Sequence, residues 1–241
     1  MKPVIVIPAR YKSSRLPGKP LEDIQGKSMI QRTYEKCLEA LPAQDVYIAT
    51  DNTKIQKHCE EFNANVVMTS SSCLTGTDRI AEAVEQIDCD VVINVQGDEP
   101  VINPNDIIKI IDAAKQYPGE IINGIAGIDT NEEFNNPSIP KVVTAPNGKL
   151  LYMSRGAIPT TKQLEFKSAW KQICIYAFPL DSLHAFAEQT VKTPLEQIED
   201  IEILRFTEMG YDVRMIELSG SSFAIDTPED LERVREYLNV A

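Results

Sequence analysis

The chain has 241 residues, 43% of them hydrophobic, and a formal net charge of −12. This acidic balance argues against a nucleic-acid-binding protein, which needs a broad basic surface to displace counterions. No run of about 18 apolar residues predicts a transmembrane helix, and the short apolar stretch at the N-terminus lacks the features of a signal peptide. We therefore expect a cytoplasmic protein with no membrane insertion and no nucleic-acid partner.

The first half of the chain predicts alternating strands and helices. Strands are expected at residues 4–7, 46–50, 65–68 and 91–95, where apolar and β-branched residues run together. Helices are expected at residues 29–41, 53–62, 78–87 and 105–117, where apolar residues recur at helical spacing. This alternation indicates a mostly parallel, Rossmann-like sheet flanked by helices.

The pattern changes after about residue 121. Asn147-Gly148 between two apolar runs predicts a hairpin of residues 142–144 and 150–153. Further strands are expected at 173–178, 213–218 and 223–226, and helices at 196–209 and from Thr227 onward. We expect these elements to extend the same sheet, so that residues 1–241 form one α/β domain with an appended hairpin region.

The cysteine and histidine content argues against a structural metal site. The five cysteines form an odd set with no CxxC pair: Cys37, Cys59, Cys73, Cys89 and Cys174. The two histidines, His58 and His184, are far apart, so zinc is not expected. Reduced cytosolic thiols are the simplest interpretation.

A basic, proline-punctuated loop follows the first predicted strand. The stretch IPARYKSSRLPGKP places Arg10, Lys12, Arg15 and Lys19 together in an acidic chain. Arginine and lysine on a glycine- and proline-shaped loop suit a polyanion such as a triphosphate. The loop matches neither GxxxxGK[ST] nor GxGxxG, so the common ATPase and dinucleotide motifs are absent. The alternative is a solvated surface loop.

Two carboxylates are candidate metal ligands. Asp98 follows the strand at 91–95, with Glu99 beside it, and Asp226 precedes the last helix. Ligands of open parallel sheets bind at the carboxyl ends of the strands, and Mg²⁺ takes one or two carboxylates together with substrate phosphates. Helix capping is the alternative role for each. Together with the basic loop, the pair predicts nucleotidyl transfer with loss of pyrophosphate.

These segments closely resemble those of a known family. The run VIPARYKSSRLPGKPL, with ATD at 49–51, GTDR at 76–79, NVQGDEP at 94–100, YMSRGAIP at 152–159 and DTPEDLERVR at 226–235, resembles the 3-deoxy-manno-octulosonate (Kdo) cytidylyltransferases. The resemblance implies a fold of the nucleotide-diphospho-sugar transferase type, a homodimer, CTP and Mg²⁺ as requirements, and a CMP-linked ulosonic acid as product. It leaves open whether that product serves lipopolysaccharide or capsule.

The resemblance also implies residue roles. It assigns residues 1–120 to nucleotide binding and 121–241 to sugar-acid binding and dimerisation. Lys19, Arg15, Asp98 and Asp226 would be catalytic, and Asp98 and Asp226 would hold the metal. Nucleotide binding would involve Arg10, Arg15, Lys19, Thr50, Thr77, Asp78 and Arg79. The sugar acid would meet Gln96, Arg155, Gln172, Tyr176 and Glu202, and its anomeric hydroxyl would be the nucleophile.

The chain departs from the family pattern on the acceptor side. Gln172 and Cys174 stand where HxGIY is expected, and Ile203 replaces a glutamine in EQLR. Polar pockets discriminate strongly when a hydrogen-bonding partner is missing. Either the chain still takes Kdo, or its acceptor is a different acid, which would be a related ulosonic acid or another acidic, hydroxylated metabolite. A non-catalytic CTP-binding relative is a further alternative, whereas a dehydrogenase would need the missing glycine fingerprint.

Overall fold

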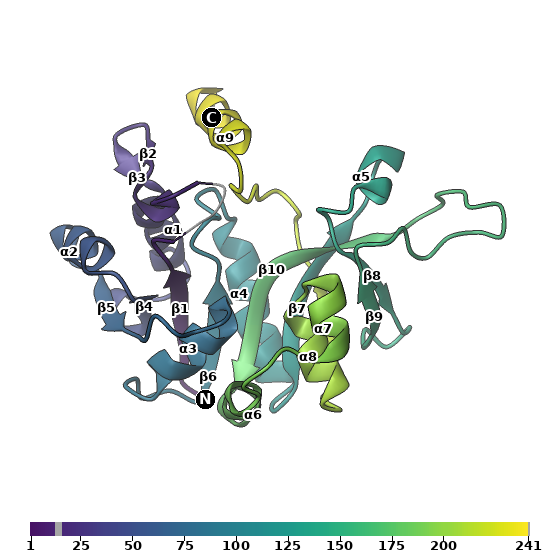
Figure 1. Cartoon of the computed structure of the whole chain (residues 1–241), viewed down its shortest axis with the longest axis horizontal. Coiled ribbons are helices and arrows are strands. Elements are labelled where there is room, and N and C mark those ends of the chain that lie inside the picture. The colour runs from purple at the N-terminus through teal and green to yellow at the C-terminus, as the bar shows by residue number, and fades with distance from the viewer. Residues whose placement is uncertain (13–15, 241) are drawn as a thin grey trace.

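The computed structural model describes residues 1–12 and 16–240 of the chain (Figure 1). Within them the central feature is a nine-stranded sheet whose main path runs β11-β7-β10-β6-β1-β4-β5. Its first-half strands are β1 (Pro3–Ala9), β4 (Val46–Thr50), β5 (Asn65–Met68) and β6 (Val91–Val95). They pair in parallel, and the strands at 46–50, 65–68 and 91–95 have the predicted bounds.

The first-half helices also follow the prediction to within a few residues at each end. They are α1 (Met29–Leu38), α2 (Thr53–Glu61), α3 (Gly76–Val84) and α4 (Pro104–Gln116). Helix α3 begins two residues earlier than predicted because Thr75 and Asp78 form a reciprocal capping box at its start. Two short strands, β2 (Asp23–Ile24) and β3 (Lys27–Ser28), precede α1.

The second half adds both parallel and antiparallel strands to the same sheet. Its strands are β7 (Ile121–Gly127), β8 (Lys141–Thr144), β9 (Leu150–Ser154), β10 (Trp170–Pro179) and β11 (Val213–Glu217). Strand β10 runs antiparallel between β6 and β7, and the predicted hairpin β8–β9 pairs with its outer end. Two short helices, α5 (Asn131–Asn135) and α6 (Leu180–Glu188), complete this region.

Two expectations for the second half were wrong, and one strand was not predicted. The helix predicted at 196–209 is two helices, α7 (Pro194–Glu199) and α8 (Ile203–Glu208), because Asp200 adopts a left-handed φ of 52° between them. Residues 223–226 form no strand: this irregular segment leads into α9 (Pro228–Val240). Strand β7 was missed because Asn123, Gly124 and Gly127 interrupt its apolar pattern.

Helices cover both faces of the sheet. One apolar cluster joins the sheet to α1, α2 and α4, and another joins it to α3, α6 and α8. A smaller cluster packs Leu231 and Val234 of α9 against Ile24 and Met29, so the last helix lies over the start of α1. Among the described residues, none of the helices combines the length and hydropathy that a bilayer span requires.

This topology sets where polar loops meet. Strands β1, β4 and β6 are adjacent and parallel, so their carboxyl ends lie at one edge of the sheet (Figure 1). The basic loop, the turn before α2 and the segment after β6 all begin there. The architecture therefore brings the charged segments predicted from the sequence to one side of the molecule.

Candidate active site

The basic loop ends at the 3-10 helix η1 (Lys19–Leu21). Gly18 precedes it with a φ of 74°, a left-handed conformation that glycine adopts without strain. The Gly18 amide donates to the carbonyl of Tyr11 at 3.0 Å and so closes the loop. The predicted phosphate contact of Arg15 falls outside the described residues.

Lys19 joins two carboxylates that are far apart in the sequence. Its Nζ lies 2.7 Å from Asp98 Oδ2 and 3.2 Å from Asp226 Oδ1, and it donates to the carbonyl of Ile225 at 2.7 Å. The Ile225 amide in turn donates to the carbonyl of Asp98 at 3.0 Å, which anchors the irregular segment before α9 beside the end of β6. The structure thus brings the two predicted metal ligands to one ammonium group.

A cavity of about 410 Å³, hereafter the first cavity, opens over this cluster. Its charged lining residues are Arg10, Lys12, Lys19, Arg79, Asp98, Glu202 and Asp226. Lys12, to which the family resemblance assigns no role, therefore faces the same space as Arg10 and Lys19. Gly97 forms part of the wall, where an added Cβ would approach the Pro8 carbonyl to 2.9 Å. The strand ends consequently pack too closely there for a larger residue.

The first cavity has donors for a divalent cation but not a complete shell. Asp98 and Asp226 supply hard carboxylate oxygens, which suit Mg²⁺. Among the described residues there is no cluster of three or more histidine, cysteine, aspartate or glutamate side chains that could hold a metal. The donor set therefore fits an ion that takes its remaining ligands from water and substrate phosphates, as Mg²⁺ usually does.

The start of α3 forms another wall of the first cavity, which includes Thr75, Gly76 and Arg79. Arg79 is 4% exposed, and its guanidinium donates to Thr69 Oγ1 at 2.5 Å and lies 3.5 Å from Asp51 Oδ2. The polar partners hold this buried cation in place at the edge of the cavity.

The other residues predicted to bind nucleotide lie behind the wall of the first cavity and do not line it. Thr50 is fully buried, and its hydroxyl accepts a bond from the Asn52 amide at 3.3 Å. Asp78 caps α3 and accepts a bond from Arg205 at 3.3 Å. Thr77 donates its hydroxyl and its amide to Glu202, at 2.5 and 3.1 Å. None of these three is among the described residues that line the first cavity, so their expected contribution is to shape its wall.

Three of the five predicted acceptor residues line one of two cavities. Gln96 and Glu202 line the first. Gln172 lines a second cavity of about 320 Å³, together with Glu99, Cys174 and Ser222. Because Glu99 directly follows Asp98 in the chain, the two cavities lie on either side of the residues that follow β6.

A β-bulge shapes the wall of the second cavity. The register between β10 and β7 shifts between Ile173 and Tyr176, and Asn123 donates from its buried side chain to the carbonyls of Ile173 and Ile175 at 2.9 and 3.0 Å. Gln172 donates to Asn123 Oδ1 and to the hydroxyl of Tyr176, both at 3.1 Å. Burial raises the pKa of Tyr176 well above its ordinary value, so the hydroxyl stays neutral.

Glu99 is the most perturbed carboxyl group at the site. It is 5% exposed, and burial raises its pKa to about 7, although a hydrogen bond from the Ser222 hydroxyl favours the charged form. The sequence offered one signal for this residue, its position between Asp98 and a proline at the end of a buried strand. The burial of Glu99 is visible only in the structure, where Ser222 of the segment before α9 contacts its carboxylate.

Arg155 does not meet the other predicted acceptor residues. Its guanidinium donates to the carbonyls of Glu199, Asp200 and Pro137 at 2.5, 3.0 and 3.0 Å. These bonds satisfy carbonyls at the end of α7 and help to stop that helix. Ile203, the other departure from the family pattern, is 1% exposed and packs in the main core. Neither residue is among the described residues that line the two cavities.

Comparison with known proteins identifies the family. A family model described as cytidylyltransferase matches residues 4–216. The chain belongs to the cytidylyltransferase family. A curated 3-deoxy-manno-octulosonate cytidylyltransferase of Protochlamydia amoebophila is 38% identical to it, with 97% of this chain and 93% of the relative covered. An 8-amino-3,8-dideoxy-manno-octulosonate cytidylyltransferase of Shewanella halifaxensis is 39% identical, with 96% of each covered.

A solved structure extends the similarity to three dimensions. It is that of a CMP:2-keto-3-deoxy-manno-octonic acid synthetase complexed with CTP, and it matches this cytidylyltransferase with a TM-score of 0.93. The two are 36% identical, with 100% of this chain and 99% of the other covered. The resemblance and the fold class predicted from the sequence are confirmed, and the protein is a nucleotidyltransferase.

Proposed function

We propose that this cytidylyltransferase couples CTP to a 3-deoxy-ulosonic acid, giving a CMP-linked sugar acid and pyrophosphate. The observation that carries the proposal is the contact of Lys19 with both Asp98 and Asp226 at the floor of a cavity with a basic rim. A triphosphate needs cations, and a metal bound to it needs carboxylates. The first cavity supplies both within one space. Such acids are the class that lipopolysaccharide synthesis consumes in activated form.

In the proposed reaction the anomeric hydroxyl of the acid attacks the α-phosphorus of CTP. The new P–O bond forms as the bond to pyrophosphate breaks, and the hydroxyl proton leaves to solvent or a nearby base. Arg10 and Lys19 bind and orient the phosphates, and Lys19 offsets the charge that accumulates on the leaving group. Asp98 and Asp226 would hold Mg²⁺, which neutralises phosphate charge and keeps the reacting oxygens in line.

The acceptor would enter from the side of Gln96, Glu202 and Gln172. Relatives at nearly the same identity are named for Kdo and for its 8-amino analogue, so both acids are candidates. The amide of Gln172 and the thiol of Cys174 line the second cavity and differ in chemistry from the histidine and glycine of the family pattern. We propose that these two residues influence which acid is accepted.

Two further properties belong to this proposal. We infer a homodimer, supported by strongly exposed apolar side chains near β9, α7 and the preceding loops: Leu151 at 64%, Leu164 at 81%, Val191 at 69% and Ile198 at 78%. Light scattering of the purified protein tests it. We also infer a cytoplasmic location, since that compartment supplies CTP.

The deciding experiment is pyrophosphate release from CTP and Mg²⁺ with a panel of acceptors. The panel contains Kdo, 8-amino-Kdo and an ulosonic acid that carries an acylated amine. Release with Kdo or 8-amino-Kdo, with the matching CMP-sugar seen by mass spectrometry, supports the function. Tight CTP binding without release from any acid would favour the alternative of a non-catalytic nucleotide-binding protein.

A further inference from the structure

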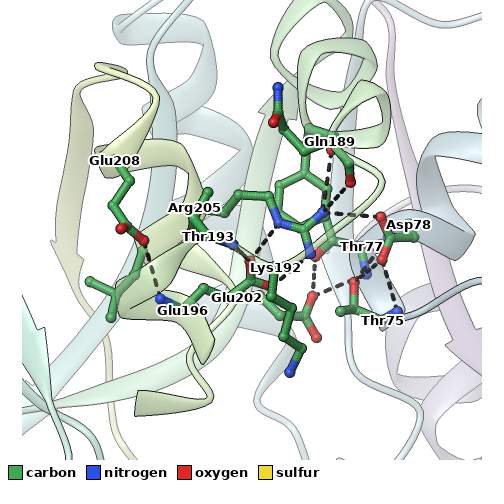
Figure 2. Close-up of polar contacts among 12 residues, drawn as sticks. Thr75, Thr77, Asp78, Gln189, Lys192, Thr193, Glu196, Glu202, Arg205 and Glu208 are labelled. Carbon is green, nitrogen blue, oxygen red and sulfur yellow. Dashed lines mark hydrogen bonds and ion pairs between the residues drawn. The ribbon is translucent and has the colours of Figure 1, made fainter. Parts of the chain in front are cut away.

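A fully buried arginine lies behind the first cavity. Arg205 of α8 is 0% exposed and forms two parallel bonds with Glu196 of α7, at 2.6 and 2.7 Å (Figure 2). Its remaining nitrogen donates at 3.3 Å to Asp78 of α3 and at 3.3 Å to the carbonyl of Phe186 in α6. The guanidinium carbon stacks 3.6 Å from the centre of the Phe186 ring. One side chain of α8 therefore contacts three other helices, α3, α6 and α7.

The buried ion pair of Arg205 and Glu196 leaves few substitutions that would preserve its hydrogen bonds. Glu196 is also fully buried, and its carboxylate accepts a further bond from the Thr193 amide at 3.1 Å. A buried ion pair is stable only when its geometry is good and its other hydrogen-bonding groups are satisfied. Arginine meets this demand with a planar, two-pronged donor, whereas lysine offers a single point charge. Lysine in this place would keep the charge and lose the geometry.

The cluster fixes the turn that carries Glu202. This turn joins α7, which holds Glu196, to α8, which holds Arg205, and Glu202 is the N-cap residue of α8. From there Glu202 reaches into the first cavity and accepts both bonds from Thr77 at the start of α3 (Figure 2). Arg205 and Glu202 thus tie α8 to the same helix at two points, one buried and one at the cavity wall.

We propose that Arg205 is a positioning residue for the acceptor side of the active site. It holds α7 and α8 against α3 so that the Glu202 carboxylate stays at the cavity wall, where the sugar acid binds. This inference rests on the proposed function. Arg205 touches no substrate in this arrangement: it acts through Glu202. The capping box at the start of α3 is formed by Thr75 and Asp78 and needs no bond from Arg205. We therefore expect CTP binding to be less affected than acceptor binding when Arg205 is replaced.

The test uses Arg205→Lys in the full-length protein, with Arg214→Lys as a matched control. Arg214 of β11 also makes a two-pronged bond, to Glu120 at 2.7 and 3.0 Å, and stacks 3.9 Å from the Tyr117 ring. It is not among the residues that line the two cavities. Arg214→Lys therefore removes a two-pronged ion pair and a ring contact of the same kind, but at a distance from the two cavities.

Arg205→Lys is expected to raise KM for the acid about tenfold or more, since small displacements of a substrate-contacting group have large effects. KM for CTP should change much less, and Arg214→Lys should alter neither KM. Hydrogen exchange provides an activity-independent readout, because the Thr77 amide that Glu202 protects should exchange faster in Arg205→Lys and not in Arg214→Lys. Phe186→Leu, with Tyr117→Leu as its control, provides a second pair should Arg205→Lys fail to fold.

Several outcomes would overturn the proposal. One is an equal rise of acceptor KM in Arg205→Lys and Arg214→Lys, and another is a lower Tm in Arg205→Lys with unchanged kinetic constants. Unchanged exchange of the Thr77 amide in Arg205→Lys or Phe186→Leu would also refute it. Wild-type protein that releases no pyrophosphate with any acid would refute the proposed function instead, so the two failures are distinguishable.

Discussion

Lys19 Nζ lies 2.7 Å from Asp98 Oδ2, although the two residues belong to different loops at the edge of the sheet. The same ammonium contacts Asp226 at 3.2 Å. A cation between two carboxylates offsets their mutual repulsion when no metal is bound. If Asp98 and Asp226 hold Mg²⁺ as proposed, Lys19 would stay near the carboxylates without the metal and become available to phosphate with it.

Asp98→Asn should abolish most catalysis while leaving the fold intact. Replacing the carboxylate by an amide removes a negative metal ligand, so we expect kcat to fall by about a hundredfold or more. Tm should change little because the Asp98 side chain remains 26% exposed. Pyrophosphate release at several Mg²⁺ concentrations measures the effect. Asp88→Asn, at a carboxylate 96% exposed on the surface, is the control, and equal losses in the two variants would contradict the assignment.

Lys19→Met should separate metal binding from catalysis. Without the ammonium, Asp98 and Asp226 repel one another, and a divalent cation relieves that repulsion. We expect Mg²⁺ to raise the Tm of the variant more than that of the wild type, by mass action on the folded state, while CTP binding and turnover fall. Thermal shifts with and without Mg²⁺ measure this. Lys27→Met, at an exposed pair with Glu35, should behave as the wild type does, and a smaller Mg²⁺ effect in Lys19→Met would count against the arrangement.

Gln172→Leu should change acceptor preference without changing the use of CTP. The amide donates to Asn123 and to the Tyr176 hydroxyl, so its loss removes a hydrogen-bond donor from two buried polar groups. Sites of this kind discriminate strongly, and we expect kcat/KM for the preferred acid to fall about tenfold or more. Steady-state kinetics with Kdo and 8-amino-Kdo measure the ratio. Gln56→Leu, on the exposed face of α2, is the control. An unchanged ratio would remove Gln172 from the acceptor site.

Cys73 should react slowly with iodoacetamide at neutral pH and faster as pH rises. Burial, reinforced by a hydrogen bond to Glu82, raises the pKa of this thiol to about 11. The reactive thiolate is therefore scarce at pH 7.5, and its fraction grows about tenfold for each pH unit below the pKa. Glu82→Gln should lower that pKa and speed the reaction. Since Cys73 lines the first cavity, CTP should protect it, and mass spectrometry of the alkylated peptide decides both points.

The parallel half of the fold was predictable because its strands are short, apolar and separated by amphipathic helices. Strand β1 shows this most clearly, because residues 4–7 form an uninterrupted, fully buried apolar run. Strand β7 could not be predicted in the same way, because Asn123 interrupts its apolar run. The side chain of Asn123 donates to two carbonyls at the bulge of the neighbouring strand β10. The break between α7 and α8 likewise involves Arg155. Its guanidinium donates to the carbonyl of Glu199 at the end of α7, 44 residues later in the chain. Such features follow from partners that are distant in sequence.

The candidate site shows the same division. The sequence suggested Lys19, Asp98 and Asp226 as a group, and the structure brings them into contact. The family resemblance placed Arg155 in the acceptor site. In the structure its guanidinium donates to backbone carbonyls instead. The sequence offered no sign that Arg205 is buried, because an arginine in a short helix usually faces solvent. The division of the chain into a nucleotide part and an acceptor part stays a prediction.

By itself the sequence determined the class of fold and the family, and it predicted that the basic loop after β1 binds a polyanion. These follow from local patterns: apolar periodicity, turn residues and the clustering of charge. Only the tertiary structure decided that Lys19 joins Asp98 to Asp226, that Glu99 is buried and that Arg205 is buried between α7 and α3. Each of these depends on segments that the folded sheet brings together, and burial and ion pairing are properties of that proximity rather than of any local pattern.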